Sequence, residues 1–331
     1  KIIIAVDAMG GENAPKKIIN GIIHHFSNNK NTYYKIFGIK KEIEKHIPKN
    51  FDKDSFELIE SSDVVHDTDT PLAAAKKGNQ TSMWLAVESV KNKKADIVIS
   101  AGNTGALFVI AKLNLQMIPN IDKPALSALW PNKKGMSVVL DLGANIECNE
   151  KNLIDFSIMG SALFKSLFPS QVPKVALLNI GSEEIKGNDI IKNTYQKLTN
   201  KINNEFEFKG YIEGNNLMNG DVNVIVADGF TGNVALKTAE GTASFITSEL
   251  KIAMTNSIFG KLSSIINLKN LKKFKERLDP RLYNGAIFIG LDSPVIKSHG
   301  STDYLGFSNS LNVCSKIIKG NLIDKIKKNI D

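Results

Sequence analysis

The sequence is poor in cysteine and in arginine, and each shortage excludes a kind of site. Cys148 and Cys314 are the only cysteines in 331 residues, so no multi-cysteine metal cluster can form, and a reducing compartment is the default expectation. Arginine occurs only at Arg277 and Arg281, too few for a pocket that holds several carboxylates with guanidinium groups. No apolar run reaches the roughly 18 residues that a membrane-spanning helix needs.

Several short fingerprints are absent as well. The chain has no Gly-x-x-x-x-Gly-Lys-Ser/Thr loop, no Gly-x-Gly-x-x-Gly segment after a predicted strand and no Gly-x-Ser-x-Gly nucleophile turn. Residues Lys1–Val6 read as a strand that runs into Asp7, so no signal peptide is expected. The formal net charge of +8 favours an anionic partner. The basic–aromatic stripe typical of nucleic-acid binding is missing, so no nucleic-acid partner is expected.

The chain does contain a regular alternation of short apolar runs and longer helical patterns. Ile2–Val6, Asp96–Ser100 and Val175–Ile180 are typical of buried strands, whereas Pro15–Phe26 and Asn152–Leu167 are typical of helices. This repetition predicts an α/β fold with a mostly parallel sheet covered by helices. No linker or internal repeat divides the chain, so one domain with an insertion and two interlocked lobes both fit.

Six predicted strands end in loops rich in glycine, asparagine and hydroxyl side chains. The loops are Asp7–Pro15, Ser100–Ala106, Asp141–Asn145, Asn179–Asn188, Asp228–Asn233 and His299–Asp303. Glycine lets a backbone approach an oxyanion, and the helix that follows offers unpaired N–H groups. Each loop alone is ordinary turn chemistry, but six at equivalent positions predict one shared anion site beyond the carboxyl ends of the strands. The candidate phosphate- or substrate-binding residues are Asp7, Gly10, Gly11, Asn103, Thr104, Gly105, Asn145, Asn188, Thr231, Gly232, His299 and Ser301.

Three of these loops also offer candidate catalysts. Lys186 lies in the loop before a predicted helix, where an ammonium group would hold phosphate or stabilise an oxyanion. Asn233 would either cap the next helix or donate from its amide to a carbonyl under attack. His299 fits a general acid or base about as well as a structural histidine. Asp7, Asp141 and Asp228 end strands and would meet if the strands share an edge, yet no metal site is predicted from them.

A basic amphipathic stretch covers residues 244–279. Ile258, Phe259, Leu262, Ile265 and Ile266 fall on one helical face, and lysines lie around the apolar stripe. This pattern suits a helix at an anionic membrane surface, although packing on the body or on a second chain explains the same pattern.

The ordered motifs together resemble one family, the phosphate acyltransferases of bacterial phospholipid synthesis (PlsX type). The motifs are Ala5–Gly11, Ser100–Ala106, Asp141–Asn145, Met159–Ser161, Asn179–Asn188, Asp228–Thr238 and Pro294–Ser301. The resemblance implies a homodimer with a Rossmann-like α/β/α sandwich similar to phosphotransacetylase and isocitrate dehydrogenase folds. Residues 1–331 would form a single domain from which 244–279 protrudes as a helical hairpin.

The resemblance also implies an activity: acyl transfer from acyl carrier protein to inorganic phosphate, without a cofactor. Lys186 and Asn233 match the family's functional lysine and asparagine. The enzyme would work in the cytoplasm at the inner face of the membrane, through contacts made by Ile258, Phe259, Leu262, Ile265 and Ile266, and supply a membrane glycerol-3-phosphate acyltransferase. Three alternatives stay open: a phosphate acetyl- or butyryltransferase that uses coenzyme A, a metal- and nicotinamide-dependent decarboxylating dehydrogenase, and a non-enzymatic protein that binds membrane or nucleic acid.

Overall fold

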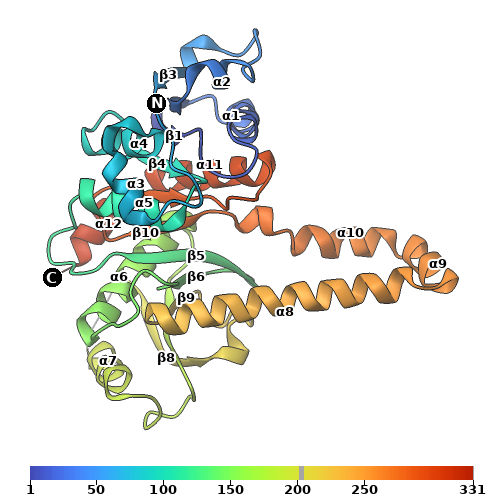
Figure 1. Ribbon diagram of the computed structural model, residues 1–331. Helices are drawn as coiled ribbons and strands as arrows, with labels where there is room; N and C mark the ends of the chain where they lie inside the picture. Colours follow the sequence, from blue (N-terminus) through green and yellow to red (C-terminus); the bar gives the residue numbers. More distant parts are fainter. Residues whose placement is uncertain (201–204, 331) are drawn as a thin grey trace.

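An eleven-stranded sheet organises the chain in the computed structural model, which describes residues 1–200 and 205–330 (Figure 1). The strand order is β3-β2-β1-β4-β11-β10-β5-β6-β9-β7-β8. One half contains β1 (Ile2–Asp7), β2 (Thr32–Gly38), β3 (Phe56–Glu60), β4 (Ile97–Ser100) and β11 (Val295–Lys297), all parallel. The other half contains β6 (Gly135–Leu140), β7 (Lys174–Asn179), β8 (Glu207–Glu213) and β9 (Val224–Val226), also parallel to one another.

The two halves run in opposite directions. β10 (Ala286–Ile289) is antiparallel to both β11 and β5 (Ala125–Asn132), and β5 is antiparallel to β6. The three antiparallel pairings reverse the sheet between β11 and β6. The loops after β1, β4 and β11 therefore leave the sheet in one direction, and the loops after β6, β7 and β9 leave in the other. The expectation that all six loops share one edge is wrong, and so is the idea that Asp7 meets Asp141 and Asp228.

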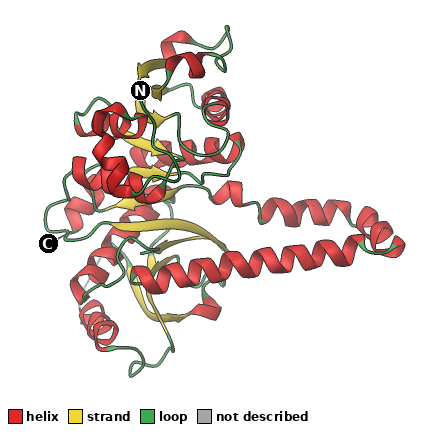
Figure 2. Ribbon diagram, viewed as in Figure 1, coloured by secondary structure: helices red, strands yellow, loops and turns green. Residues whose placement is uncertain are grey.

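Helices cover both faces of the sheet (Figure 2). Along β1, Ile4 and Val6 face a core with Ile18, Phe156 and Phe307, whereas Ala5 faces a second core. The first face holds α1 (Lys16–Asn28), α6 (Glu150–Leu167), α11 (Tyr304–Lys319) and α12 (Leu322–Asn329). The second holds α4 (Ser82–Lys91) and α5 (Thr104–Asn114), with α3 (Pro71–Lys77) beside α5. α2 (Lys40–Glu44) and α7 (Asp189–Asn200) complete the body. This arrangement confirms the expected α/β/α class.

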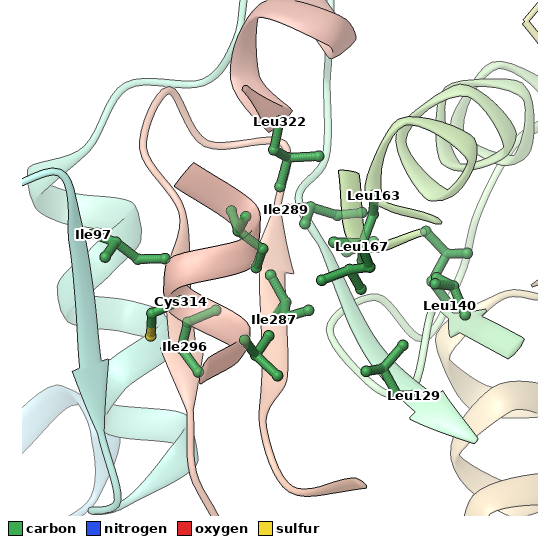
Figure 3. Close-up of a cluster of buried hydrophobic side chains, with 14 of the residues drawn as sticks. Ile97, Leu129, Leu140, Leu163, Leu167, Ile287, Ile289, Ile296, Cys314 and Leu322 are labelled. Atoms are coloured by element: carbon green, nitrogen blue, oxygen red, sulfur yellow. The ribbon is translucent and has the colours of Figure 1, made fainter. Parts of the chain in front are cut away.

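The seam between the two halves has a continuous apolar core (Figure 3). Ile296 of β11, Ile287 and Ile289 of β10, and Leu129 and Leu140 of β5 and β6 contribute to it. All but Leu129 are at most 1% exposed. The same cluster takes in Leu163 and Leu167 of α6 and Leu322 of α12. Burial of such side chains, at about 1.5–3 kcal/mol each, holds the two half-sheets together across the reversal.

A helical hairpin projects from the body (Figure 1). It consists of the second half of α8 (Gly229–Thr255), then α9 (Ile258–Ile266) at the tip and α10 (Leu268–Arg277) on the way back. Only Gly229 and Gly232 of α8 are buried, and α10 has no buried residue. In the described part of the chain, no helix combines the length and the apolar character needed to cross a membrane.

Candidate active site

Asp141 shapes the loop that follows β6. Its carboxylate is fully buried and accepts hydrogen bonds from the backbone N–H groups of Leu126, Gly143, Ala144 and Asn145, at 2.8–3.2 Å. The Asn145 amide donates to the same carboxylate at 2.8 Å and to the Pro124 carbonyl at 2.7 Å. The predicted site residue Asn145 thus uses its side chain to support the loop.

The start of α8 packs directly on this loop. Two glycines one turn apart allow the close approach, because a Cβ on Gly232 would lie 1.9 Å from the Asp141 carbonyl oxygen and one on Gly229 would lie 2.4 Å from that of Asn145. Asp228 caps the helix and accepts from both the N–H and the hydroxyl of Thr231, each at 2.8 Å. The result is a helix N-terminus with its unpaired N–H groups held beside a rigid loop.

The packing places Asn233 at the mouth of the loop. Its side chain is exposed, and its amide donates to the Leu142 carbonyl at 3.0 Å. A Cβ on Gly143, whose φ is +129°, would lie 3.0 Å from the Asn233 amide nitrogen. The structure therefore brings Asn145, Thr231, Gly232 and Asn233 together, as the sequence predicts for this half of the sheet.

Lys186 lies in the neighbouring loop after β7. The loop is held by the Asn179 amide, which donates to the carbonyls of Gly181 and Lys186, each at 3.2 Å. The Lys186 side chain is exposed, and no ion pair to its ammonium is found among the described residues. Asn188 caps α7 by accepting from Ile191 N–H at 2.9 Å. Lys186 is thus a solvent-facing cation at the same edge as Asn233.

An open pocket lies among the three loops of this edge. It is lined by Ile146, Cys148 and Asn149 after β6, by Asn188, Ile190 and Ile191 at the start of α7, and by Asp228, Phe230 and Thr231 at the start of α8, with Lys123, Glu147 and Leu153 around them. Burial raises the pKa of the Cys148 thiol to about 11, which favours the protonated thiol at neutral pH. The pocket offers the N-termini of α6, α7 and α8 beside an apolar wall.

The other half of the sheet presents a second set of predicted residues. The Asp7 carboxylate is 1% exposed and accepts from the hydroxyls of Ser82 and Ser100, each at 2.6 Å. Burial raises the pKa of Asp7, and these hydrogen bonds oppose the rise. Gly10 and Gly11 follow directly, and a Cβ on Gly10 would lie 2.5 Å from the Gly102 nitrogen. Asp7 thus supports the loops after β1 and β4, as Asp141 supports the loop after β6.

The remaining predicted residues surround these glycines. Asn103 caps α5 by accepting from Ala106 N–H at 3.1 Å, and its amide donates to the carbonyls of Asp67 and Asp69. Thr104 is exposed, and Gly105 packs against Pro71. His299 and Ser301 are exposed after β11, with the histidine Nδ1 2.9 Å from the serine hydroxyl.

Two lysines at this edge were missed by the sequence reasoning. Lys17 of α1 is 6% exposed and Lys297 of β11 is 8% exposed. The Lys17 ammonium donates to the Gly300 carbonyl, and the Lys297 ammonium donates to the carbonyls of Ser298 and, at 3.3 Å, Ala101. Burial and the charge of Lys17 lower the pKa of Lys297 to about 8, and burial lowers that of Lys17. In a chain so rich in lysine, the sequence offers no signal for Lys17, and for Lys297 only its place in a run of buried strand residues.

The two sets of loops start from strands that are apart in the sheet. β11 and β6 are three strand positions apart, about 14 Å at the usual spacing. α8 forms the link between them, since the Glu240 and Lys237 charges on its third turn act on the pKa of His299, which burial lowers. Ala235, Leu236 and Ala239 fix this part of α8 on the sheet.

Comparison with known proteins agrees with this architecture. A family model described as fatty acid synthesis protein matches residues 2–325. The phosphate acyltransferase of Pelagibacter ubique is 74% identical over 327 residues, which cover 99% of this chain and 98% of that protein. The phosphate acyltransferase of Maricaulis maris is 39% identical over 332 residues and covers 99% of this chain and 94% of its own length.

A solved structure supports the fold independently. The EutD phosphotransacetylase from Staphylococcus aureus superposes with a TM-score of 0.60 at 14% identity, over 97% of this chain and 94% of that one. At this identity the likeness concerns the fold alone, and it confirms the expected similarity to the phosphotransacetylase fold. The full-length family match and the identity to named relatives go further. The chain belongs to the fatty acid synthesis protein family and, within it, to the phosphate acyltransferases, which are transferases.

Proposed function

We propose that this enzyme transfers the acyl group of an acyl–acyl carrier protein to inorganic phosphate, giving acyl phosphate and free carrier protein for phospholipid synthesis. The observation that carries the proposal is the 74% identity to a phosphate acyltransferase over 99% of the chain. The carrier protein as donor is the finer part of the proposal. The formal net charge of +8 supports it, because an acidic carrier would be attracted to a basic surface.

The reaction needs no activated serine or cysteine, because phosphate is already an oxyanion nucleophile. The enzyme has to hold the phosphate, orient it and stabilise the tetrahedral oxyanion formed at the thioester carbon. In the proposed mechanism the ammonium of Lys186 and the N–H groups at the starts of α7 and α8 hold the phosphate. The amide of Asn233 donates to the carbonyl oxygen. The thiolate is a good leaving group, so His299 is not needed as an acid.

A donor comparison tests the proposal. Phosphate-dependent release of free carrier protein from acyl–carrier protein should proceed with a kcat/KM at least about tenfold above that for acyl–coenzyme A with the same chain. Equal or better use of the coenzyme A thioester would instead mean that the enzyme takes its acyl group from coenzyme A, as a phosphate acetyl- or butyryltransferase does. Release without added phosphate would contradict phosphate as the acceptor.

The hairpin would bring this reaction to the membrane. Ile258 and Phe259 are 83% and 84% exposed, and Ile265 and Ile266 are 64% and 76% exposed, all on α9 at the tip. The side chain of Leu262 lies outside what the structure describes. α10 adds Lys269, Lys272, Lys273 and Lys275 behind the tip. We propose peripheral binding to the inner face of the cytoplasmic membrane, where a membrane glycerol-3-phosphate acyltransferase would receive the acyl phosphate.

Vesicle flotation checks this proposal. Wild-type protein should float with anionic vesicles, and Phe259→Glu should bind at least about tenfold more weakly, because it removes an apolar side chain from the lipid and adds a repelled charge. Leu72→Glu on α3, a residue that is 64% exposed, is the matched control and should float as wild type. Undiminished flotation of Phe259→Glu would exclude the tip as the membrane contact.

A second copy of the chain would cover much of α8. Val234, Phe245 and Ile246 are 51%, 65% and 55% exposed on a 27-residue helix that has only two buried residues. Single chains rarely leave so much apolar helix surface in water. We therefore propose a homodimer, for which sedimentation should give twice the chain mass of 36.3 kDa.

A further inference from the structure

We propose that Asn179 and Gly187 are positioning residues, which together hold Lys186 where its ammonium acts in acyl transfer to phosphate. The inference rests on the proposed function for the role of Lys186 and deepens it, because it names what fixes this lysine in place. Asn179 ends β7, and Gly187 follows the lysine directly in residues 180–188, the Lys186 loop. Both residues act through Lys186 and are assigned no contact with a substrate.

The structure describes the Lys186 loop in full, and its side chains lie in solvent. Positions 180, 182–186 and 188 are exposed, and the two isoleucines, Ile180 and Ile185, are each 82% exposed. A segment that buries little apolar surface keeps its shape through hydrogen bonds and backbone geometry. The position of Lys186 therefore depends on a small number of polar contacts.

The Asn179 amide joins the two ends of this loop. Its NH₂ group donates to the carbonyls of Gly181 and Lys186, each at 3.2 Å, so both amide hydrogens serve the loop. The Tyr195 hydroxyl donates to the Glu184 carboxylate at 3.0 Å and holds the middle of the loop. The end of the loop that carries the lysine is thus tied to β7 through Asn179.

Two glycines let the lysine and the asparagine come close. A Cβ on Gly181 would lie 3.0 Å from Cγ of Lys186, so the stem of the lysine lies directly over this glycine. Gly187 has a φ of +95°, and a Cβ on it would lie 2.6 Å from Oδ1 of Asn179. A side chain at position 187 would therefore strain the backbone and push on the Asn179 amide. Both the backbone and the stem of Lys186 are held by these neighbours.

A fixed backbone matters for this lysine because its side chain is long and exposed. In the proposed mechanism its ammonium has to meet phosphate beside Asn233, and a misplacement of about 1 Å can lower a rate by about 10²-fold. Loss of the Asn179 amide, or a methyl group at Gly187, should therefore reproduce part of the loss caused by removing the lysine itself.

The experiment is a set of double-mutant cycles in the full-length enzyme. Asn179→Ala and Gly187→Ala are each made alone and together with Lys186→Ala. Asn193→Ala is the matched control, because the Asn193 amide also donates at this edge, at 2.7 Å, but to Glu150 on α6. The readouts are kcat, KM for phosphate, KM for the acyl donor and the melting temperature.

The expected result is a loss of about 10- to 10²-fold in kcat/KM for phosphate for Asn179→Ala and for Gly187→Ala, with KM for the donor unchanged. Asn193→Ala should stay within about twofold of wild type. Once Lys186 is alanine, neither change should lower activity further by more than about twofold, because groups that act as a unit are not additive.

Two results would overturn the proposal and leave the proposed function standing. One is near-normal turnover by Asn179→Ala and Gly187→Ala beside a large loss in Lys186→Ala. The other is an equal loss from Asn179→Ala with and without Lys186, following the melting temperature, which would mark a merely structural residue. Near-normal turnover by Lys186→Ala would instead overturn both the positioning roles and the proposed role of the lysine.

Discussion

Lys186→Ala is expected to lower kcat by about 10²- to 10³-fold, with the fold intact. In the proposed mechanism the Lys186 ammonium carries the positive charge that offsets the phosphate and the oxyanion. Nothing in the described protein depends on this side chain, because it is exposed and unpaired. The measurement is steady-state turnover with acyl–carrier protein and saturating phosphate, beside a thermal melt that should match wild type.

Lys192→Ala separates this role from a general loss of charge. Lys192 lies one turn into α7 and pairs with Asp189 at 3.1 Å, so it carries the same charge at the same edge. It should keep kcat within about twofold, as expected for an exposed pair of this kind. Near-normal turnover by Lys186→Ala would remove this residue from the mechanism, whatever the other variants do.

Asn233→Asp should also lower kcat by about 10²-fold, which is the usual effect of losing one oxyanion donor. The change keeps the shape of the side chain but replaces the donating NH₂ with an oxygen that would repel the developing negative charge. The hydrogen bond to the Leu142 carbonyl is lost as well, which should lower stability by only about 1 kcal/mol. Turnover and thermal melting of the same preparation give both numbers.

Asn145 offers a contrasting control one loop away. Its amide is held by Asp141 and by the Pro124 carbonyl, so Asn145→Asp should chiefly destabilise the loop. Asn233→Asp should show a large loss of kcat with a small change in melting temperature, and Asn145→Asp a larger melting change. If the kcat losses of the two variants merely followed their melting temperatures, Asn233 would be a structural residue.

Most strands and helices of this fold are predictable from periodicity. Phe56–Glu60, Pro71–Lys77, Ser82–Lys91 and Asp189–Asn200 agree with the structure at both ends. The reversal of the sheet was not predictable in the same way. It depends on β5 (Ala125–Asn132), which Pro124 precedes and Pro131 interrupts, and on the direction of β10. When this seam is not known, the sequence predicts that all six loops lie at one edge of the sheet, because apolar runs alone do not encode strand direction.

The residues of the candidate site also differ in whether the sequence predicts them. Residues whose role is backbone geometry, such as Gly11 and Gly232, stand out in the sequence because few other residues fit those places. Lys17 and Lys297 do not stand out, since the sequence does not distinguish a buried lysine from a surface lysine. Their burial follows from α1 and β11 packing into the body, which only the tertiary structure shows.

The length of α8 sets the distance between the candidate site and the membrane surface. The helix begins at Gly229, beside Asn233, and ends at Thr255, next to the tip, so its 27 residues measure about 40 Å. The part of α8 beyond Ala239 projects from the body and measures about 24 Å, so with the tip in the headgroups the body would stand off from the lipid by an amount of that order. A small folded domain of about 100 residues has a radius of gyration near 13 Å, so a carrier protein of that size would span this gap beside the helix. The hairpin would thus act as a spacer that leaves the donor room to dock while the acyl chain is released near the bilayer.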